Sequence, residues 1–165
     1  MMVTTAIIIL ALVTLQRLSE LIIAKRNTAQ LQAKGAVEHG ASHYPVMVLL
    51  HASWLLGLWW LGWNATIIWP LMLAYIALQG FRIWILATLG SRWTTRILTL
   101  PNETLVARGP YRFMRHPNYA LVLLEVPLLP LALGLNAFAI IYCILNIAML
   151  AWRIRIENAA LLASR

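Results

Sequence analysis

The chain has 165 residues, of which 62% are hydrophobic and only 11% are charged, and its formal net charge is +8. Soluble domains carry about 25% charged residues, so this composition indicates an integral membrane protein, and the length favours a single domain over residues 1–165. The chain has one cysteine and no Asp, which excludes an internal disulfide, a thiolate metal site and aspartyl chemistry, so we expect no metal site.

Five apolar stretches approach the length of about 20 residues that a helix needs to cross a bilayer. The expected spans are roughly residues 3–24, 45–63, 66–88, 118–134 and 136–156. The first lacks the basic start of a signal peptide, so we expect it to be retained as a helix. Residues 1–88 would hold the first three helices and residues 89–165 the last two, with polar connections at 25–44 and 89–117.

The basic residues are distributed asymmetrically over these segments. All thirteen Lys and Arg residues except Arg17 and Arg82 fall in the two polar connections or near the end of the chain. The positive-inside rule therefore predicts five spans, with the N-terminus outside and the C-terminus in the cytoplasm. The same asymmetry explains the net charge through anionic headgroups, so no nucleic-acid partner is expected.

The third connection is expected to form a cap at the cytoplasmic surface. Residues 93–98 and 104–106 flank the turn Pro101-Asn102-Glu103, which predicts a short hairpin. The polar, basic and aromatic run Gly109–Tyr119 follows. In a membrane protein such a run must face water or a cavity lined by protein, which makes it a candidate reaction site.

Local rules place the end of this run at the start of the fourth helix. His116 precedes Pro117 and is expected at the break before the helix, because a residue before proline avoids the helical conformation. Asn118 would then lie in the first turn, where free backbone N–H groups collect.

A second polar group lies at the end of the fifth span. Arg153 and Glu157 are four residues apart and share one helix face with Asn146 and Tyr142. They form either a surface ion pair or a functional pair, and the run at 109–119 favours the functional interpretation.

Two carboxylates fall within predicted spans. Glu20 has Arg17 and Gln16 as local partners, whereas Glu125 has none and is expected to pair with Arg82 or to face a substrate tunnel.

Three features of the sequence are informative together: Tyr111, the run Arg115–Tyr119 and the later pattern Arg153-x-x-x-Glu157-x-x-x-Leu161. With this spacing the chain resembles the isoprenylcysteine carboxyl methyltransferase family over roughly residues 80–162. The resemblance implies a membrane enzyme that uses S-adenosylmethionine without a Rossmann domain and releases S-adenosylhomocysteine. It implies that Arg153 faces the methyl acceptor. The residues that it assigns to the cofactor are Thr104, Leu105, Val106, Tyr111, His116, Pro117, Asn118, Tyr119 and Glu157.

The first connection adds to the resemblance. Glu38-His39-Gly40 and His43-Tyr44-Pro45 are similar to bacterial members associated with polyketide synthases, which methylate alkylpyrones. The resemblance therefore implies a bacterial inner-membrane O-methyltransferase acting on a lipophilic acidic acceptor, either an alkylpyrone-like enol or a prenylcysteine-like carboxylate. Leu121 and Asn158 depart from the Gly and Glu of many family members, which bears against a prenylated protein as substrate.

Two other functions stay open at this point. A membrane methyltransferase for phospholipid amines or other lipids would need a base near the methyl donor, because an amine must lose a proton before it attacks. A small transport or assembly protein would bind no cofactor, and its charged residues would pair only with one another.

Overall fold

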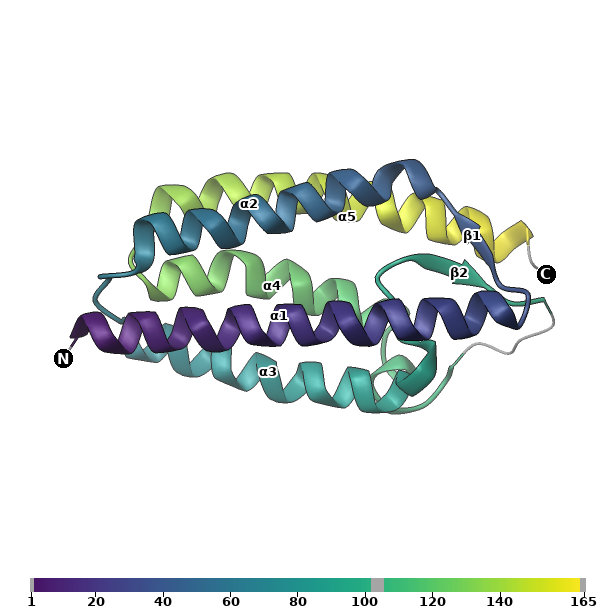
Figure 1. The fold of residues 1–165 in the computed structure, drawn as a ribbon, viewed down its shortest axis with the longest axis horizontal. Helices are drawn as coiled ribbons and strands as arrows, with labels where there is room; N and C mark the ends of the chain where they lie inside the picture. Colours follow the sequence, from purple (N-terminus) through teal and green to yellow (C-terminus); the bar gives the residue numbers. More distant parts are fainter. Residues whose placement is uncertain (1, 102–105, 164–165) are drawn as a thin grey trace.

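The computed structural model describes residues 2–101 and 106–163, and over these residues the chain forms one elongated bundle of five α-helices (Figure 1). The N-terminus lies at one end of the bundle and the C-terminus at the other. The helices are α1 (Met2–Ala33), α2 (Tyr44–Gly62), α3 (Trp69–Leu89), α4 (Pro117–Ala132) and α5 (Asn136–Ala163).

The helices confirm an all-α integral membrane bundle. Among the described residues, α1, α2, α3 and α5 are each long and apolar enough to cross a membrane. Helix α4 has 16 residues, about 24 Å, which is shorter than a bilayer core of about 30 Å. Large apolar side chains such as Leu49, Trp60 and Ile83 are exposed on the outside of the bundle, as expected for a surface that faces lipid.

Local chemistry sets where the helices begin and end. Pro45, Pro70 and Pro117 lie in the first turns of α2, α3 and α4, where a missing N–H costs no hydrogen bond. Helix α1 continues past residue 24, the predicted end of the first span, to Ala33. Helix α4 packs against both α3 and α5 and therefore lies at the centre of the bundle.

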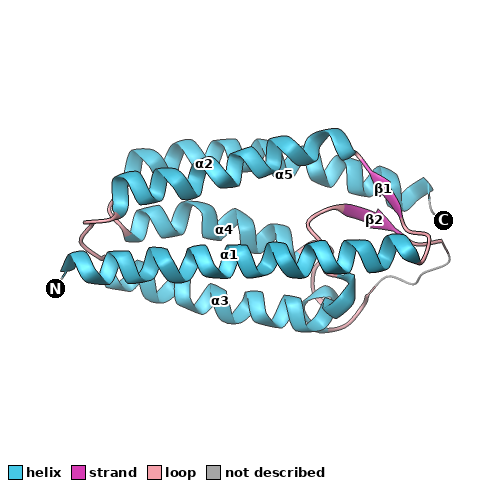
Figure 2. Cartoon of the chain, viewed as in Figure 1, coloured by secondary structure: helices cyan, strands magenta, loops and turns pink. Residues whose placement is uncertain are grey.

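The hairpin predicted within the third connection lies partly outside the described residues. Strand β2 (Ile97–Thr99) is present, but among the described residues it pairs antiparallel with β1 (Val37–His39), in the first connection (Figure 2). Val106 belongs to no strand, and residues 104–105 lie outside the described residues.

The pairing of β1 with β2 has a physical cause. Both long connections emerge at the same end of the bundle, and Gly35, with φ of 88°, turns the chain back after α1. An ion pair between Arg96 Nη1 and Glu38 Oε1 at 2.6 Å then joins the two segments. The small sheet thus ties the N-terminal third of the chain to the segment that precedes α4.

Candidate functional site

The polar run before α4 is anchored on α3. Its 3-10 helix η3 (Gly109–Arg112) begins at Gly109, whose φ is 58° and whose position leaves no space for a Cβ beside the Thr88 side chain. His116 precedes the first residue of α4, as predicted, and Asn118 lies half-buried in the first turn. Two local features therefore fix the approach of this run: a glycine turn against α3 and a proline helix start.

Three side chains, from α5, from α4 and from the residue before α4, meet at the end of the bundle. The Tyr119 hydroxyl donates a hydrogen bond to the Glu157 carboxylate. The His116 ring stacks on the Tyr119 ring, with centroids 5.3 Å apart and planes inclined by 23°, and His116 Nδ1 lies 3.6 Å from Glu157 Oε1. The structure therefore brings together the two polar groups that are distant in sequence.

Tyr111 borders this group from η3. It is half-buried and packs against the buried cluster that contains Trp93 and Leu121. Burial, and next to it the negative charge of Glu157, raises the pKa of Tyr111 to about 12. Its phenol is therefore a neutral hydrogen-bond donor at any physiological pH. Of the upstream residues assigned to the cofactor, Val106 is half-buried, and Thr104 and Leu105 lie outside the described residues.

Arg153 is buried among neutral groups. Its side chain donates from Nη1 to His43 Nε2 at 3.1 Å and to Met47 Sδ at 2.7 Å, and from Nη2 to the Thr95 carbonyl at 3.0 Å. The residue is only 6% exposed. Over the residues that the structure describes, no carboxylate forms a salt bridge with its guanidinium.

The surface ion pair of Arg153 with Glu157 is accordingly not formed. Tyr119 lies between them: its hydroxyl binds Glu157, and its ring centroid lies 5.7 Å from the Arg153 guanidinium carbon. The Tyr119 side chain thus contacts both charged residues of α5, of which the positive one is buried and the negative one is partly open to solvent.

Two polar residues expected on the same face of α5 have structural contacts. Asn146 Nδ2 donates to the Val122 carbonyl at 3.1 Å, and the Tyr142 hydroxyl donates to Ser53 Oγ at 3.0 Å. These contacts hold α5 against α4 and α2, and they leave Arg153 and Glu157 as the polar residues of this face that lie at the site.

Two other arginines within the helices, Arg17 and Arg82, are paired with carboxylates. Arg82 binds Glu20 at 2.8 Å and Glu125 through Nε at 3.0 Å, and Arg17 binds Glu20 at 3.3 Å and Glu125 at 3.2 Å. The predicted partners of Glu20 and Glu125 are confirmed, and they form one four-residue network that joins α1, α3 and α4. Its two positive and two negative charges cancel.

Sequence reasoning missed the groups that surround Arg153. His43 is the last residue before α2, Met47 lies in the first turn of α2, and Thr95 lies in the segment before β2, so none of them is near Arg153 in sequence. The His43-Tyr44-Pro45 pattern could have indicated these neighbours, because it lies at the end of the first connection, on the side of the membrane predicted for Arg153.

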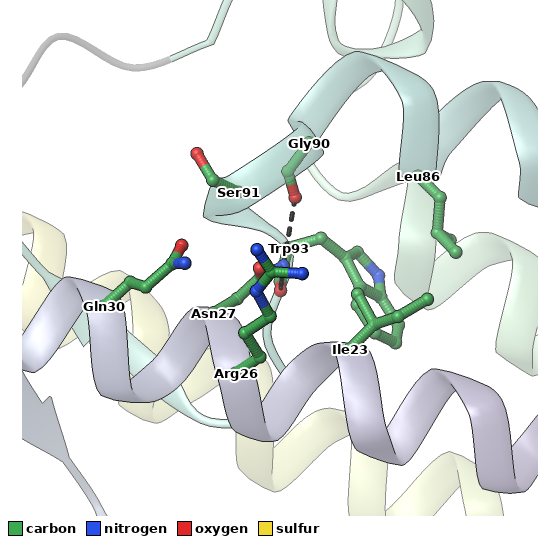
Figure 3. A pocket seen from close by; sticks show the side chains of 8 residues that line it. All are labelled: Ile23, Arg26, Asn27, Gln30, Leu86, Gly90, Ser91 and Trp93. Carbon is green, nitrogen blue, oxygen red and sulfur yellow. Dashed lines mark hydrogen bonds between the residues drawn. The ribbon is translucent and has the colours of Figure 1, made fainter.

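Two hollows lie on either side of α1. The first, of about 370 Å³, separates α1 from the end of α3, and Figure 3 shows Asn27 crossing it to bind the carbonyls of Gly90 and Trp93. The second, of about 540 Å³, has Tyr44, Thr95 and Arg96 on the wall opposite α1. Because the Thr95 carbonyl holds Arg153, the second hollow is one residue away from the buried guanidinium.

Comparison with known proteins gives two matches. The model of the isoprenylcysteine carboxyl methyltransferase (ICMT) family matches residues 70–163. The chain is also similar to a Bacillus subtilis (strain 168) protein named "Uncharacterized protein YpbQ", with 36% identity over 167 residues that cover 93% of this chain and 95% of the relative. No solved structure matches the chain.

Proposed function

Because the chain belongs to the isoprenylcysteine carboxyl methyltransferase family and is thus a membrane methyltransferase, we propose that it transfers a methyl group from S-adenosylmethionine to an oxygen of a lipophilic acidic acceptor. The acceptor is an alkylpyrone-like enol or a prenylcysteine-like carboxylate, bound as its anion. The observation that supports this acceptor class is the buried Arg153, whose described partners are all neutral.

A buried cation without a counter-ion is costly. Removing an ion from water carries a penalty of several kcal/mol, which a neutral hydrogen-bond acceptor offsets only in part. The chain provides carboxylates for Arg17 and Arg82 but provides none, among the described residues, for Arg153. The missing negative charge fits an acceptor anion, and the planar guanidinium suits a carboxylate or an enolate.

Glu157 fits the cationic end of the methyl donor. Its side chain is 28% exposed, and its described partners are His116 and the Tyr119 hydroxyl, with no Lys or Arg within salt-bridge distance among the described residues. S-adenosylmethionine would supply an electrophilic methyl group on a sulfonium. Beside Glu157, we assign Val106, Tyr111, His116, Pro117, Asn118 and Tyr119 to its binding, together with Thr104 and Leu105.

The roles of the chain's own residues follow from these assignments. Glu157 binds the positive charges of the donor, and Tyr119 orients the Glu157 carboxylate through its hydroxyl. Arg153 binds the acceptor anion and holds its oxygen in line with the methyl group. An acceptor that is already ionised needs no strong base, so the protein mainly contributes alignment and exclusion of water. An amine acceptor would lack this match, because its charge has the same sign as that of Arg153.

We place the site at the cytoplasmic face of a bacterial inner membrane, with the N-terminus outside. The site and the C-terminus lie at the end of the bundle where the two basic connections emerge, as the positive-inside rule requires. The water-soluble donor then reaches the site from the cytoplasm and the acceptor reaches it from the lipid.

The test uses the purified protein in detergent. Isothermal titration with S-adenosylhomocysteine measures cofactor binding, and transfer of labelled methyl groups to a synthetic long-chain alkylpyrone and to a prenylated N-acetylcysteine measures activity. We expect Arg153→Ala to retain cofactor binding and to lose transfer. Arg155→Ala, an exposed position on the same helix, is the matched control and should retain both. Normal turnover by Arg153→Ala, or no cofactor binding by the wild type, would overturn the proposal.

A further inference from the structure

His43 lies against Arg153 but falls outside residues 70–163, the part of the chain that matches the family. Its side chain is 1% exposed, and its Nε2 atom lies 3.1 Å from Arg153 Nη1. The Trp152 ring meets the imidazole edge-on, with centroids 5.9 Å apart. The imidazole thus lies against α5, with one nitrogen directed at the arginine.

The backbone before His43 fixes this position. The 3-10 helix η1 (Ala41–His43) links β1 to α2 and follows Gly40, whose φ is 62°. A Cβ at Gly40 would lie 2.7 Å from a methyl carbon of Ile156 and 2.9 Å from His43 Nδ1, so only glycine fits between the imidazole and α5. The pairing of β1 with β2 holds the same segment from the other side.

The contact determines the charge of His43. A guanidinium has donors and no acceptor, so the nitrogen that faces it must offer a lone pair. Nε2 is therefore unprotonated, the ring proton is on Nδ1, and the imidazole is neutral. Met47 Sδ and the Thr95 carbonyl, the other partners of Arg153, are also neutral acceptors. All three orient the guanidinium without cancelling its charge.

We propose that His43 is a positioning residue that fixes Arg153 as a neutral hydrogen-bond acceptor and thereby makes the site selective for an anionic methyl acceptor. This inference rests on the proposed function. A carboxylate at position 43 would orient Arg153 equally well, but it would cancel the positive charge and repel an incoming anion.

The test compares His43→Gln with His43→Glu, two side chains of nearly the same shape that differ by one charge. Both should bind S-adenosylhomocysteine about as well as the wild type. We expect His43→Gln to stay close to the wild-type KM for whichever acceptor the wild type methylates, the long-chain alkylpyrone or the prenylated N-acetylcysteine. His43→Glu should raise that KM about tenfold or more relative to His43→Gln with a smaller change in kcat, since two opposite charges in contact interact by several kcal/mol even at an effective dielectric constant of about 20.

A second pair guards against misfolding at position 43. Met47→Glu and Met47→Gln place the same two groups on the other side of the Arg153 Nη1 atom and leave His43 intact. Equal KM values for Glu and Gln, in whichever pair yields folded protein, would overturn the inference. If the wild type binds cofactor and methylates the anionic acceptor, but the Glu and Gln variants have equal KM values, only the role of His43 is refuted. A wild type that neither binds cofactor nor transfers methyl to either acceptor refutes the proposed function and, with it, the inference.

Discussion

The buried network of Arg17, Glu20, Arg82 and Glu125 makes a quantitative prediction about stability. Glu125 is fully buried and accepts hydrogen bonds from Arg82, from Arg17 at 3.2 Å and from Gln79 at 2.9 Å. Glu125→Gln preserves the shape of the side chain and removes one negative charge. Two arginines would then share Glu20 as their carboxylate among the described residues, and the network would carry one uncompensated positive charge inside the bundle.

The expected cost follows from the number of charges left. Removing one partner of a buried ion pair destabilises a protein by roughly 3–5 kcal/mol, and the contacts that Glu20 retains to both arginines place Glu125→Gln near the lower end. The double variant Arg82→Met with Glu125→Leu removes one charge of each sign and leaves Arg17 paired with Glu20 at 3.3 Å. We expect it to lose about 1 kcal/mol or less, because a buried pair and an apolar pair of similar volume differ little in stability.

The measurement is reversible unfolding in mixed micelles with increasing dodecyl sulfate, followed by far-ultraviolet circular dichroism. The double variant, Arg82→Met alone, Glu125→Leu alone and the wild type form a double-mutant cycle, and Glu125→Gln is measured beside them. A coupling free energy of roughly 2 kcal/mol or more is expected between Arg82 and Glu125. Additive effects of the two single changes would refute the conclusion that charge balance, rather than packing, holds this network together.

Three further predictions concern the site and the helix packing. Glu157→Gln should weaken binding of S-adenosylhomocysteine roughly 10- to 100-fold in isothermal titration, because a hydrogen bond to a charged group contributes about 1.5–3 kcal/mol; unchanged affinity would remove Glu157 from cofactor binding. Since the pKa of Tyr111 is raised to about 12, its phenol stays protonated, and Tyr111→Phe should show the same pH dependence of cofactor binding as the wild type up to about pH 10. A change in cofactor affinity near pH 10 that only the wild type shows would contradict this. Gly57→Ala should destabilise the bundle by about 1–3 kcal/mol, because a Cβ there would lie 2.5 Å from the Phe138 ring. Gly80→Ala, where a Cβ meets open space, should stabilise the bundle by about 0.5–1 kcal/mol. Similar unfolding midpoints for the two variants would argue against this packing.

Local sequence rules predicted much of the fold. Hydropathy predicted where the helices lie, because an apolar segment inside lipid must satisfy its backbone hydrogen bonds within itself, as an α-helix does. Proline chemistry placed the start of α4 at Pro117. The pairing of Glu125 with Arg82 was also predictable, because a charge within a span requires a partner and few were available.

Non-local contacts account for what the sequence did not reveal. The partner of β2 depends on where the end of α1 meets the third connection, and no local pattern around residues 97–99 specifies that. The environment of Arg153 likewise depends on residues more than fifty positions away in the chain, with a separation of 58 residues to Thr95 and 110 to His43. Composition and periodicity describe single elements, and these contacts arise from the way the elements are packed.

The short length of α4 bears on how the proposed lipophilic acceptor reaches this site. Helix α4 is about 6 Å shorter than a typical hydrocarbon core. With one end of α4 at one boundary of the core, its other end lies below the headgroups of the opposite boundary. His116 and Tyr119 lie at the start of α4. On the proposed function, a long-tailed acceptor reaches the site by sideways diffusion within the leaflet and presents its polar head without being lifted into water.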